Sequence, residues 1–370
     1  MRIQIDATPL LLVSAGVKNY FYYWLRHLRR QAGGDEILAF PFLGDYGALT
    51  HERSVVSRWA TYPRLALLYF VNTPGNPAIE WVAARADVFH ASNQVRVPPR
   101  RTRLTATIHD LTCWLMPELH TEANVRADRN HAEKVLKPAA GLIAVSESTK
   151  RDAVRLLDLD PDRIHVIHPG VAEPYFRTSE EGVARVTAAY GLRRPYILFL
   201  GTVEPRKNLD TLLDACAALP APVRREADLV VIGPPGWRAE ATLRRLQSGE
   251  EGVRYLGYVP ESVLPSLVAG ARVFVYPSLY EGFGFPVAQA MAAGVPVVVS
   301  NVSSLPEVAG DGGLLVDPRS VSELRSAINR VLTNDALRAQ LGRQARERAR
   351  RYSWDECARR SLGFFRNVAG

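Results

Sequence analysis

The hydrophobic positions of this chain fall into short apolar runs separated by longer amphipathic segments. The runs have the character of buried strands and lie at residues 2–5, 37–42, 87–92, 104–110, 140–145, 163–167, 195–200, 228–233, 253–256, 273–276, 296–300 and 314–316. Segments with helical character lie between them, such as 20–32, 124–136 and the tail from about 320. Strands that alternate with helices indicate a mostly parallel sheet, so the pattern predicts an α/β fold.

The pattern is interrupted near the middle of the chain. Residues 173–191 contain Pro174, Gly182 and a Ser-Glu-Glu run, and the next apolar run at 195–200 then restarts a buried strand. A length of 370 residues also favours two domains over one. We therefore expect four parts, which are a first domain at 1–172, a linker at 173–192, a second domain at 193–352 and a terminal helix at 353–370.

One stretch of the second domain, YPSLYEGFGFPVAQAMAAGVPVVVSN at 276–301, has the order strand, loop, helix, strand. Its loop carries the carboxylate of Glu281 and a G-F-G-F run at 282–285. Pro286 stands where the first helical residue is expected, and Gly294 is expected to end the helix. Backbone N–H groups at a helix N-terminus attract anions, so this loop is a candidate site for a diphosphate.

A basic motif follows the apolar run at 195–200. The sequence GTVEPRKNL at 201–209 ends the strand with a glycine and presents Arg206 and Lys207 before a helix that should begin near Leu209. Residues just beyond the carboxyl end of a parallel strand face the ligand in doubly wound sheets. An arginine fork and a lysine point charge at that place can bind two phosphates.

The two motifs together resemble those of the retaining GT-B glycosyltransferases of family 4, a group that includes many mannosyltransferases. The likeness is carried by E-P-R-K-N at 204–208 and E-G-F-G-F at 281–285, which occur in the family's order. The resemblance implies a GT-B architecture in which two Rossmann-like domains face each other across a cleft. It also implies that the terminal helix crosses back to the first domain, with Trp354, Phe364 and Phe365 buried.

The resemblance also assigns roles to single residues. Glu281 would contact hydroxyl groups of the donor sugar, and Arg206 and Lys207 would bind the donor diphosphate and offset the charge of the leaving group. The family's second carboxylate, which contacts the ribose, is replaced here by Gln289, which keeps an acceptor oxygen and gains a donor but has no charge. The other donor-binding residues that the resemblance implies are Gly16, Val259, Gly282, Phe283, Gly284 and Phe285.

Two histidines lie at the ends of predicted strands in the first domain. His109 closes a β-branched run and is followed by Asp110, which could orient the imidazole or cap the next turn. The resembled family has a functional histidine at this point, near the donor sugar, so His109 joins Glu281 as a catalytic candidate. His90 lies at an equivalent strand end and is a secondary candidate.

Composition and charge narrow the classes of protein further. The chain has 46 Lys and Arg against 38 Asp and Glu, a net charge of +8, which favours anionic partners such as sugar nucleotides or acidic lipid surfaces. Its three cysteines form no C-x-x-C pair and are expected to be reduced core thiols. No suitable D-x-D motif is visible, so no metal site is expected, and the two cations of the basic motif would take the role of a metal. No secretory signal or membrane-spanning run is visible, which favours a cytoplasmic protein.

Two segments are open to more than one interpretation. The apolar and aromatic run YPRLALLYFV at 62–71 could pack in the core, which is the favoured interpretation, or could contact a lipid or the acceptor. The arginine-rich segment at 336–351 could be a solvated helix face, again the favoured interpretation, or an anionic membrane contact.

The sequence therefore predicts a retaining, metal-independent hexosyltransferase without a cofactor. The donor would be a nucleoside diphosphate sugar, with GDP-mannose favoured and a UDP-sugar open, and the acceptor a glycan or a lipid-linked glycan in cell-surface polysaccharide synthesis. Peripheral contact with the inner face of the cell membrane also stays open. Alternatives are a GT-B phosphorylase or sugar-nucleotide epimerase, and a non-catalytic binder of sugar nucleotides. A nucleic-acid binder fits poorly, because the basic residues are not interleaved with aromatic residues on one face.

Overall fold

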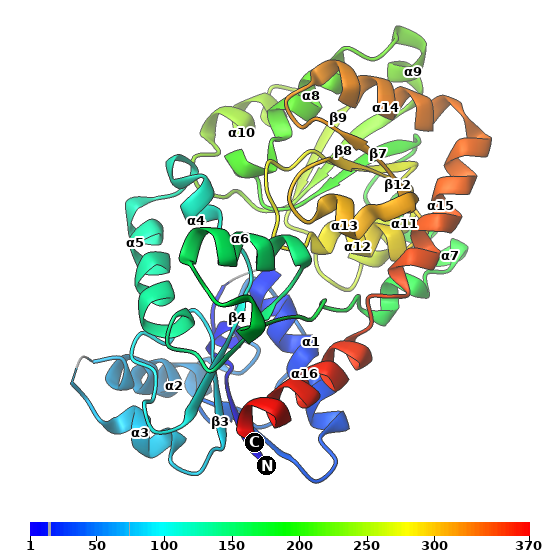
Figure 1. Ribbon diagram of the computed structural model, residues 1–370. Coiled ribbons are helices and arrows are strands. Elements are labelled where there is room, and N and C mark those ends of the chain that lie inside the picture. Colours follow the sequence, from blue (N-terminus) through cyan, green and yellow to red (C-terminus); the bar gives the residue numbers. More distant parts are fainter. Residues whose placement is uncertain (14–15, 74) are drawn as a thin grey trace. The chain divides into compact units, whose positions relative to one another are not determined.

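The computed structural model describes residues 1–13, 16–73 and 75–370, which form two compact units (Figure 1). Unit 1 consists of Met1–Gly170 together with Ser353–Gly370, and unit 2 consists of Val171–Tyr352. Each unit contains a six-stranded sheet in which the paired strands are parallel.

The sheet of unit 1 has the strand order β2-β1-β3-β4-β5-β6. Its strands are β1 (Arg2–Asp6), β2 (Glu36–Phe40), β3 (Val88–Ala91), β4 (Arg103–Ile108), β5 (Gly141–Ala144) and β6 (Ile164–Val166). Its helices are α1 (Gly16–Gln31), α2 (Arg58–Val71), α3 (Ala78–Ala83), α4 (Thr112–Leu115), α5 (Glu122–His131), α6 (Glu147–Leu157) and α16 (Trp354–Ala369). Strands β3 and β5 are buried along their whole length, because helices cover both faces of a parallel sheet of this kind.

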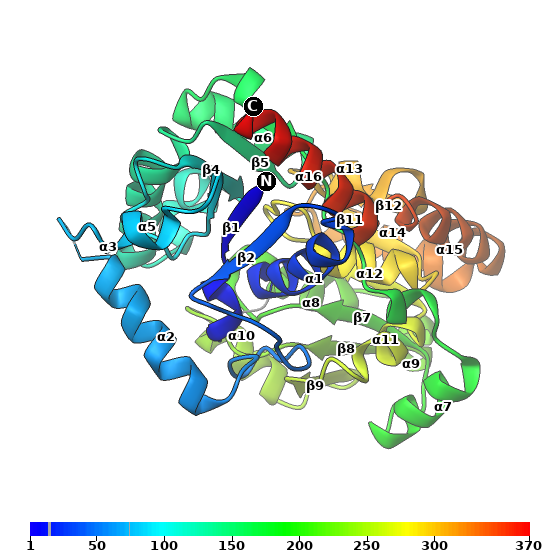
Figure 2. The ribbon, with the colours of Figure 1, turned by 90° about the horizontal axis from the view of Figure 1, so that it is seen from below.

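The terminal helix α16 belongs to unit 1, where it lies alongside α1 in both views (Figures 1 and 2). Its amphipathic sequence turns Trp354, Phe364 and Phe365 inward, and all three are buried, which confirms the prediction of their burial. The indole of Trp24 on α1 donates a hydrogen bond from Nε1 to Oγ of Ser361, 2.9 Å away. This bond fixes the position of α16 on α1 because both partners are buried.

The sheet of unit 2 has the order β12-β11-β10-β7-β8-β9, so the strand order reverses between β7 and β10. Its strands are β7 (Tyr196–Leu200), β8 (Asp228–Ile232), β9 (Val253–Gly257), β10 (Val273–Tyr276), β11 (Val297–Ser300) and β12 (Gly313–Val316). Its helices are α7 (Glu180–Ala189), α8 (Leu209–Ala217), α9 (Ala221–Glu226), α10 (Glu240–Gln247), α11 (Leu264–Ala269), α12 (Phe285–Ala292), α13 (Leu305–Ala309), α14 (Val321–Thr333) and α15 (Asp335–Ala349). Open sheets of this order bind ligands beyond the carboxyl ends of the strands at the point of reversal.

One glycine in unit 2 is required by a close approach of two loops. Gly233 follows β8 with φ +145°, and a Cβ atom there would lie 1.9 Å from the carbonyl oxygen of Gly201, which follows β7. No larger residue fits without moving one of the two loops. The carboxyl ends of β7 and β8 can thereby lie close together, and β7 borders the point of reversal.

Every predicted strand overlaps an observed one, but some predicted boundaries and connections were wrong. Helix α1 begins at Gly16 rather than near Tyr20, so Gly16 starts the helix instead of lying in the preceding loop, and Ala15 lies outside the described residues. The expected linker at 173–192 is folded as part of unit 2, where it contains α7 and the buried side chain of Tyr175.

The interpretation of 62–71 as a core segment was also wrong for one face of the helix. Helix α2 places Leu67, Leu68 and Val71 against the core of unit 1. Its opposite face, however, leaves Tyr62 and Tyr69 exposed to solvent. The one charge in the run, Arg64, lies three residues before Leu67 and thus on the core-facing side, so it does not mark the exposed face.

Two expectations from composition can be compared with the structure directly. All three cysteines, Cys113, Cys216 and Cys357, are buried free thiols, as expected. No helix within the described ranges is both long enough and apolar enough to cross a membrane.

Candidate active site

The two motifs from the sequence meet in unit 2 at the point where the strand order reverses. The first forms a short 3-10 turn, Pro205–Lys207, just beyond β7, and the second forms the loop that follows β10. Asn208 adopts a left-handed conformation with φ +57° and starts α8. Its side-chain amide donates to the carbonyl oxygens of Pro277, at 3.0 Å, and Pro318, at 2.6 Å, and so fastens the basic turn to the end of β10.

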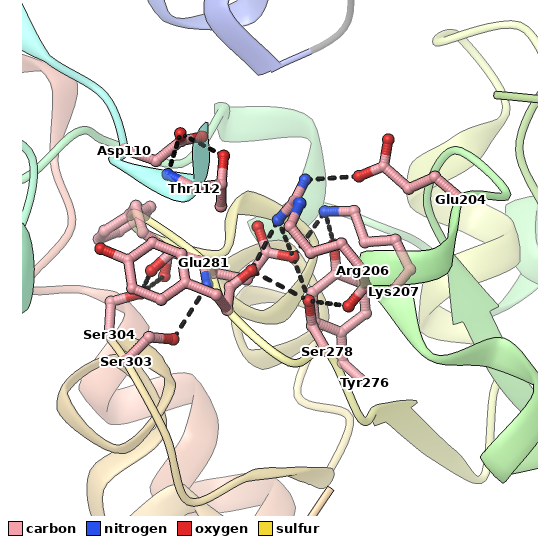
Figure 3. Close-up of polar contacts among 12 residues, drawn as sticks. Asp110, Thr112, Glu204, Arg206, Lys207, Tyr276, Ser278, Glu281, Ser303 and Ser304 are labelled. Carbon is pink, nitrogen blue, oxygen red and sulfur yellow. Dashed lines mark hydrogen bonds and ion pairs between the residues drawn. The ribbon is translucent and has the colours of Figure 1, made fainter. Parts of the chain in front are cut away.

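A buried cluster of two cations and two carboxylates results (Figure 3). Nζ of Lys207 lies 2.5 Å from Oε1 of Glu281, and Nη1 of Arg206 lies 3.0 Å from the same oxygen. Nη2 of Arg206 lies 2.6 Å from Oε1 of Glu204, and Nζ of Lys207 also donates to the hydroxyl oxygen of Tyr276 at 2.7 Å. The charges of the four ionised groups sum to zero, which allows the cluster to remain buried.

The electrostatic environment keeps Glu281 ionised. Burial alone would raise the pKa of its carboxyl, but Arg206, Lys207 and a hydrogen bond from Oγ of Ser278, at 2.7 Å, lower the pKa to about 2. The pKa of Lys207 is lowered by burial and by Arg206, against the pull of the carboxylates. Burial raises the pKa of the Tyr276 hydroxyl well above its usual range, so the hydroxyl stays neutral.

Three side chains hold one oxygen of the Glu281 carboxylate. The contacts from Arg206, Lys207 and Ser278 all join Oε1 of this carboxylate. A carboxylate whose one oxygen is fixed by cations can accept hydroxyl hydrogen bonds with the other. This arrangement suits a sugar, which presents hydroxyl groups.

Two serines after β11 hold the glycine-rich loop in place. Oγ of Ser303 accepts a hydrogen bond from the backbone N–H of Glu281 at 2.9 Å. Oγ of Ser304 donates to the carbonyl oxygens of Glu281, at 2.9 Å, and Phe283, at 3.0 Å. Gly284 has φ +94° and precedes α12, and an added Cβ would lie 2.9 Å from the side chain of Leu305. The loop amides are thus presented at the N-terminus of an eight-residue helix.

The other donor-site candidates of unit 2 lie at different places on its elements. Gln289 lies in the second turn of α12, and its buried side-chain amide forms no hydrogen bond within the described ranges. Val259 follows β9 and is buried. Its backbone N–H and C=O form no hydrogen bond in the described part of the chain, so they could bond a nucleobase.

The unit 1 candidates have different surroundings. His109 follows β4 and packs edge-on against Tyr20 of α1, with ring centroids 4.9 Å apart. Desolvation lowers the pKa of His109 to about 4, although Asp110 acts in the opposite direction, so the ring is neutral at pH 7. Asp110 accepts hydrogen bonds from the backbone N–H and Oγ1 of Thr112, at 3.2 and 2.8 Å, and therefore caps the following turn. Gly16 is exposed, and a Cβ there would meet nothing within 4 Å.

His90 has a structural role. Both ring nitrogens are 3.0 Å from threonine hydroxyls of β4, Nδ1 from Thr105 and Nε2 from Thr107. The ring is fully buried, and desolvation lowers its pKa to about 3. A neutral histidine with both nitrogens occupied in the core is not free to act on a substrate.

Sequence reasoning missed several residues that complete the unit 2 site. Glu204 stands inside the E-P-R-K-N motif, and its position two residues before Arg206 was the signal that could have revealed it. Tyr276 ends β10 and could have been noticed as a polar side chain at a strand end. Ser303 and Ser304 gave no such signal, because only the pairing of β11 beside β10 brings them near the loop. Within the residues that the structure describes, no group of three His, Cys, Asp or Glu side chains could hold a metal ion.

Comparison with known proteins agrees with this geometry. Residues 14–173 match the family described as Glycosyltransferase Family 4, and residues 188–348 match Glycosyl transferases group 1. O-antigen chain mannosyltransferase B of Escherichia coli is 36% identical over 282 residues, which cover 75% of this chain and 74% of that protein. D-inositol 3-phosphate glycosyltransferase of Nocardioides sp. is 34% identical over 253 residues, which cover 64% of this chain and 55% of that protein.

A solved structure gives the same result for the fold. Sucrose-phosphate synthase from Thermosynechococcus elongatus has a TM-score of 0.75 and 21% identity, with 100% of this chain and 99% of that chain covered. Two Rossmann-like units, each with a parallel six-stranded sheet, and this likeness define a GT-B fold. The chain belongs to glycosyltransferase family 4.

Proposed function

We propose that this protein is a retaining, metal-independent hexosyltransferase that uses a nucleoside diphosphate sugar, with GDP-mannose favoured. The observation that carries the proposal is the cluster of Arg206, Lys207 and Glu281 at the strand reversal of unit 2. The acceptor would be a glycan or a lipid-linked glycan in cell-surface polysaccharide synthesis. The name of the mannosyltransferase relative supports both the sugar and this setting.

The residues of unit 2 supply the chemistry that transfer requires. The bond between the sugar's anomeric carbon and the diphosphate breaks, and a bond from that carbon to an acceptor oxygen forms. The acceptor proton leaves with the diphosphate. Negative charge grows on the diphosphate as the bond breaks, and Arg206, Lys207 and the loop amides at 282–285 stabilise it where it develops. Glu281 orients the sugar through its hydroxyl groups, and His109 of unit 1 is proposed to act on the same sugar as a neutral ring.

Calorimetric titration of GDP, UDP, ADP and TDP without added metal tests the donor assignment. Selective binding of GDP is expected, and selective binding of UDP would change the donor to a UDP-sugar. Incubation with the matching sugar nucleotide and glycan acceptors, followed by NMR of the product's anomeric proton, then tests retention. Absence of binding by all four nucleotides would overturn the donor site.

Arg206→Ala should weaken nucleoside diphosphate binding by about 1.5–3 kcal/mol, the range for a hydrogen bond to a charged group. Arg206 is placed by Glu204 and by the carbonyl of Tyr280, to which its Nη1 donates at 2.6 Å, so its loss removes a positioned cation. Titration of the same nucleotide into both proteins measures the difference. Arg244→Ala, at an exposed position of α10, is the matched control and should bind as the parent does. An unchanged Kd for Arg206→Ala would place the diphosphate elsewhere.

Gln289→Glu should change the affinity for nucleotides that carry a ribose diol. The amide side chain of Gln289 makes no hydrogen bond within the described ranges, which leaves it able to contact the ribose, and a carboxylate would accept from both hydroxyls. Paired titrations of ribo and 2′-deoxy nucleotides into both variants measure the contact. Equal binding of both forms by both variants would show that this contact does not exist.

A non-catalytic sugar-nucleotide binder is the second candidate, because Gln289 stands where the family has its second carboxylate. Slow turnover of the donor with a glycan acceptor would reject the binder. Turnover of donor without any acceptor sugar would instead favour the epimerase alternative, and release of a sugar phosphate in the presence of inorganic phosphate would favour the phosphorylase.

We place the protein in the cytoplasm, with peripheral contact to the inner face of the cell membrane. The net charge of +8 supports an acidic lipid partner, and a lipid-linked acceptor would require such a place. Fractionation of cells into soluble and membrane-associated protein, before and after a high-salt wash, tests this location.

A further inference from the structure

Helix α2 of unit 1 has an outward face of aromatic and apolar residues, with one exposed charge, Arg58, at its first position. Trp59, Tyr62, Ala66, Tyr69 and Phe70 are all exposed and are spaced three or four residues apart or adjacent, so they share one side of the helix. Trp59 is 90% exposed and Tyr69 is 82% exposed. The solvent face of a surface helix is normally charged or polar. A continuous aromatic face of this kind marks an interaction surface.

Two further exposed aromatic residues lie on segments next to α2, which are α3 and the loop after β2. Trp81 of α3 is 78% exposed, and Phe42 after β2 is also exposed. The carbonyl of Phe42 accepts a hydrogen bond at 3.0 Å from Nη2 of Arg64, which lies on α2. Figure 2 shows α2 along the outer margin of unit 1, with α3 near one of its ends. The exposed aromatic residues of this region therefore lie on neighbouring segments of unit 1.

A basic segment is fastened to this same surface. The side chain of Asn72, which caps the C-terminus of α2, accepts from the backbone N–H of Arg96 at 2.7 Å. The carboxylate of Glu80 on α3 accepts from the backbone N–H groups of Arg100, at 2.6 Å, and Arg101, at 3.3 Å. These bonds hold the main chain and leave the arginine side chains to project outward, where they are exposed.

The basic side chains of this segment line a pocket. Its volume is about 720 Å³, and its lining includes Arg96, Arg100, Arg101, Arg103 and Lys134. Within the residues that the structure describes, the side chains of Arg96, Arg100, Arg101 and Lys134 form no ion pair or hydrogen bond. Cations gathered without carboxylate partners repel one another, so the pocket favours an anion.

We propose that the outward face of α2, Trp81 and this basic pocket form a docking surface for an anionic phospholipid bilayer. Tryptophan and tyrosine favour the level of the lipid headgroups, because their rings are apolar and their edges are polar. A basic pocket beside them can bind lipid phosphates, and each cation near an acidic membrane surface adds to the attraction. An aromatic face beside a basic pocket fits a bilayer, which offers an apolar interior and anionic phosphates side by side. A protein partner would have to present an apolar patch and an acidic patch in the same arrangement. This proposal rests on the peripheral membrane contact suggested above, but not on the transferase reaction.

The arginine-rich helix α15 of unit 2 is a poorer candidate for the same contact. Arg346 donates to the carbonyl of Phe176 at 2.5 Å, and Arg348 donates to the carbonyls of Val308, at 2.9 Å, and Glu307, at 2.5 Å. Arg350 pairs with Glu347 at 2.6 Å. Arg346 and Arg348 are therefore bonded within unit 2 and do not lie on a fully solvated face, whereas Arg343, Arg350 and Arg351 are exposed.

Co-sedimentation of the whole protein with vesicles tests the proposal. The parent should bind vesicles of phosphatidylcholine and phosphatidylglycerol, and not vesicles of phosphatidylcholine alone. The paired variants Tyr69→Ser/Phe70→Ser and Arg100→Glu/Arg101→Glu should each lower the binding about tenfold or more. All four positions are exposed, so the variants should fold, and titration of a nucleoside diphosphate should give the parent's Kd for both.

Matched controls make the outcome specific. Leu315→Ser removes an exposed apolar side chain of unit 2, and Arg343→Glu/Arg351→Glu reverses two exposed arginines elsewhere, and both should bind vesicles as the parent does. The proposal would be overturned if these controls lost as much vesicle binding as the test variants. It would also be overturned if Tyr69→Ser/Phe70→Ser or Arg100→Glu/Arg101→Glu bound vesicles as the parent does. Saturable binding of inorganic phosphate that displaces the vesicles would show a soluble-anion site instead. Vesicle binding without any nucleotide binding would overturn the donor site and leave this proposal standing.

Discussion

Lys207→Met should lower the affinity for a nucleoside diphosphate about a hundredfold, near the upper end for a charge-assisted hydrogen bond. It should also destabilise the fold by about 3–5 kcal/mol, the cost of removing one partner of a buried ion pair. Nζ of Lys207 is held by Glu281 at 2.5 Å and by Tyr276 at 2.7 Å, and the side chain is buried. Methionine fills a similar volume, so the loss reflects the charge. Titration calorimetry and urea unfolding at pH 7 measure the two effects.

The double variant Lys207→Met/Glu281→Gln shows how much of the lost stability comes from leaving the Glu281 carboxylate without its lysine partner. Without Lys207, the carboxylates of Glu281 and Glu204 outnumber the remaining cation, Arg206, and the site becomes net negative toward a phosphate. Neutralising Glu281 should therefore return part of the stability lost in the single variant. If the double variant loses as much stability as the two single variants together, the 2.5 Å contact between Lys207 and Glu281 contributes no stability. That result would contradict the prediction that the two side chains form a stabilising buried ion pair.

Much of the sheet and both binding motifs could be predicted because their signals are local. Parallel strands buried on both faces have nearly continuous apolar sequences, as in PYILFL before Arg206 and VFVY before Glu281. Residues just beyond the carboxyl end of a parallel strand face the ligand in doubly wound sheets, so the residues after β7 were expected to contact the donor. The sequence could not show that β7 and β10 are adjacent, which is a matter of strand order.

The features that were missed depend on tertiary contacts. Ser303 supports the Glu281 loop only because β11 pairs with β10, and nothing near Ser303 in the sequence indicates this. The segment 62–71 is apolar apart from Arg64, which lies on the same side of the helix as Leu67, so its composition could not tell which side of α2 meets the core. Only packing shows that Leu67 and Leu68 turn inward while Tyr69 turns outward.

Glu281→Gln should lower turnover about a hundredfold while the Kd for the free nucleoside diphosphate changes little. The carboxylate is expected to hold the sugar through Oε2, and a hydrogen bond to a charged group contributes about 1.5–3 kcal/mol. The diphosphate is bound by Arg206 and Lys207, which the variant retains. Initial rates with a sugar nucleotide, alongside titration of the diphosphate alone, separate the two roles. Glu240→Gln, at an exposed position of α10, is the matched control. Equal losses of turnover and of diphosphate affinity would make Glu281 a structural acid.

The same substitution should change how stability depends on pH. The pKa of Glu281 is about 2 in the folded protein and 4.5 as its ordinary value, so the ionised carboxyl adds roughly 3 kcal/mol of stability at neutral pH. Because the folded-state pKa is lowered, this contribution is present above pH 4.5 and is lost as the pH falls through about 2. The difference in unfolding free energy between the parent and Glu281→Gln should therefore be largest at pH 7 and shrink below pH 4.5. A difference that stays constant between pH 7 and pH 3 would mean that the cations near Glu281 do not stabilise its charge.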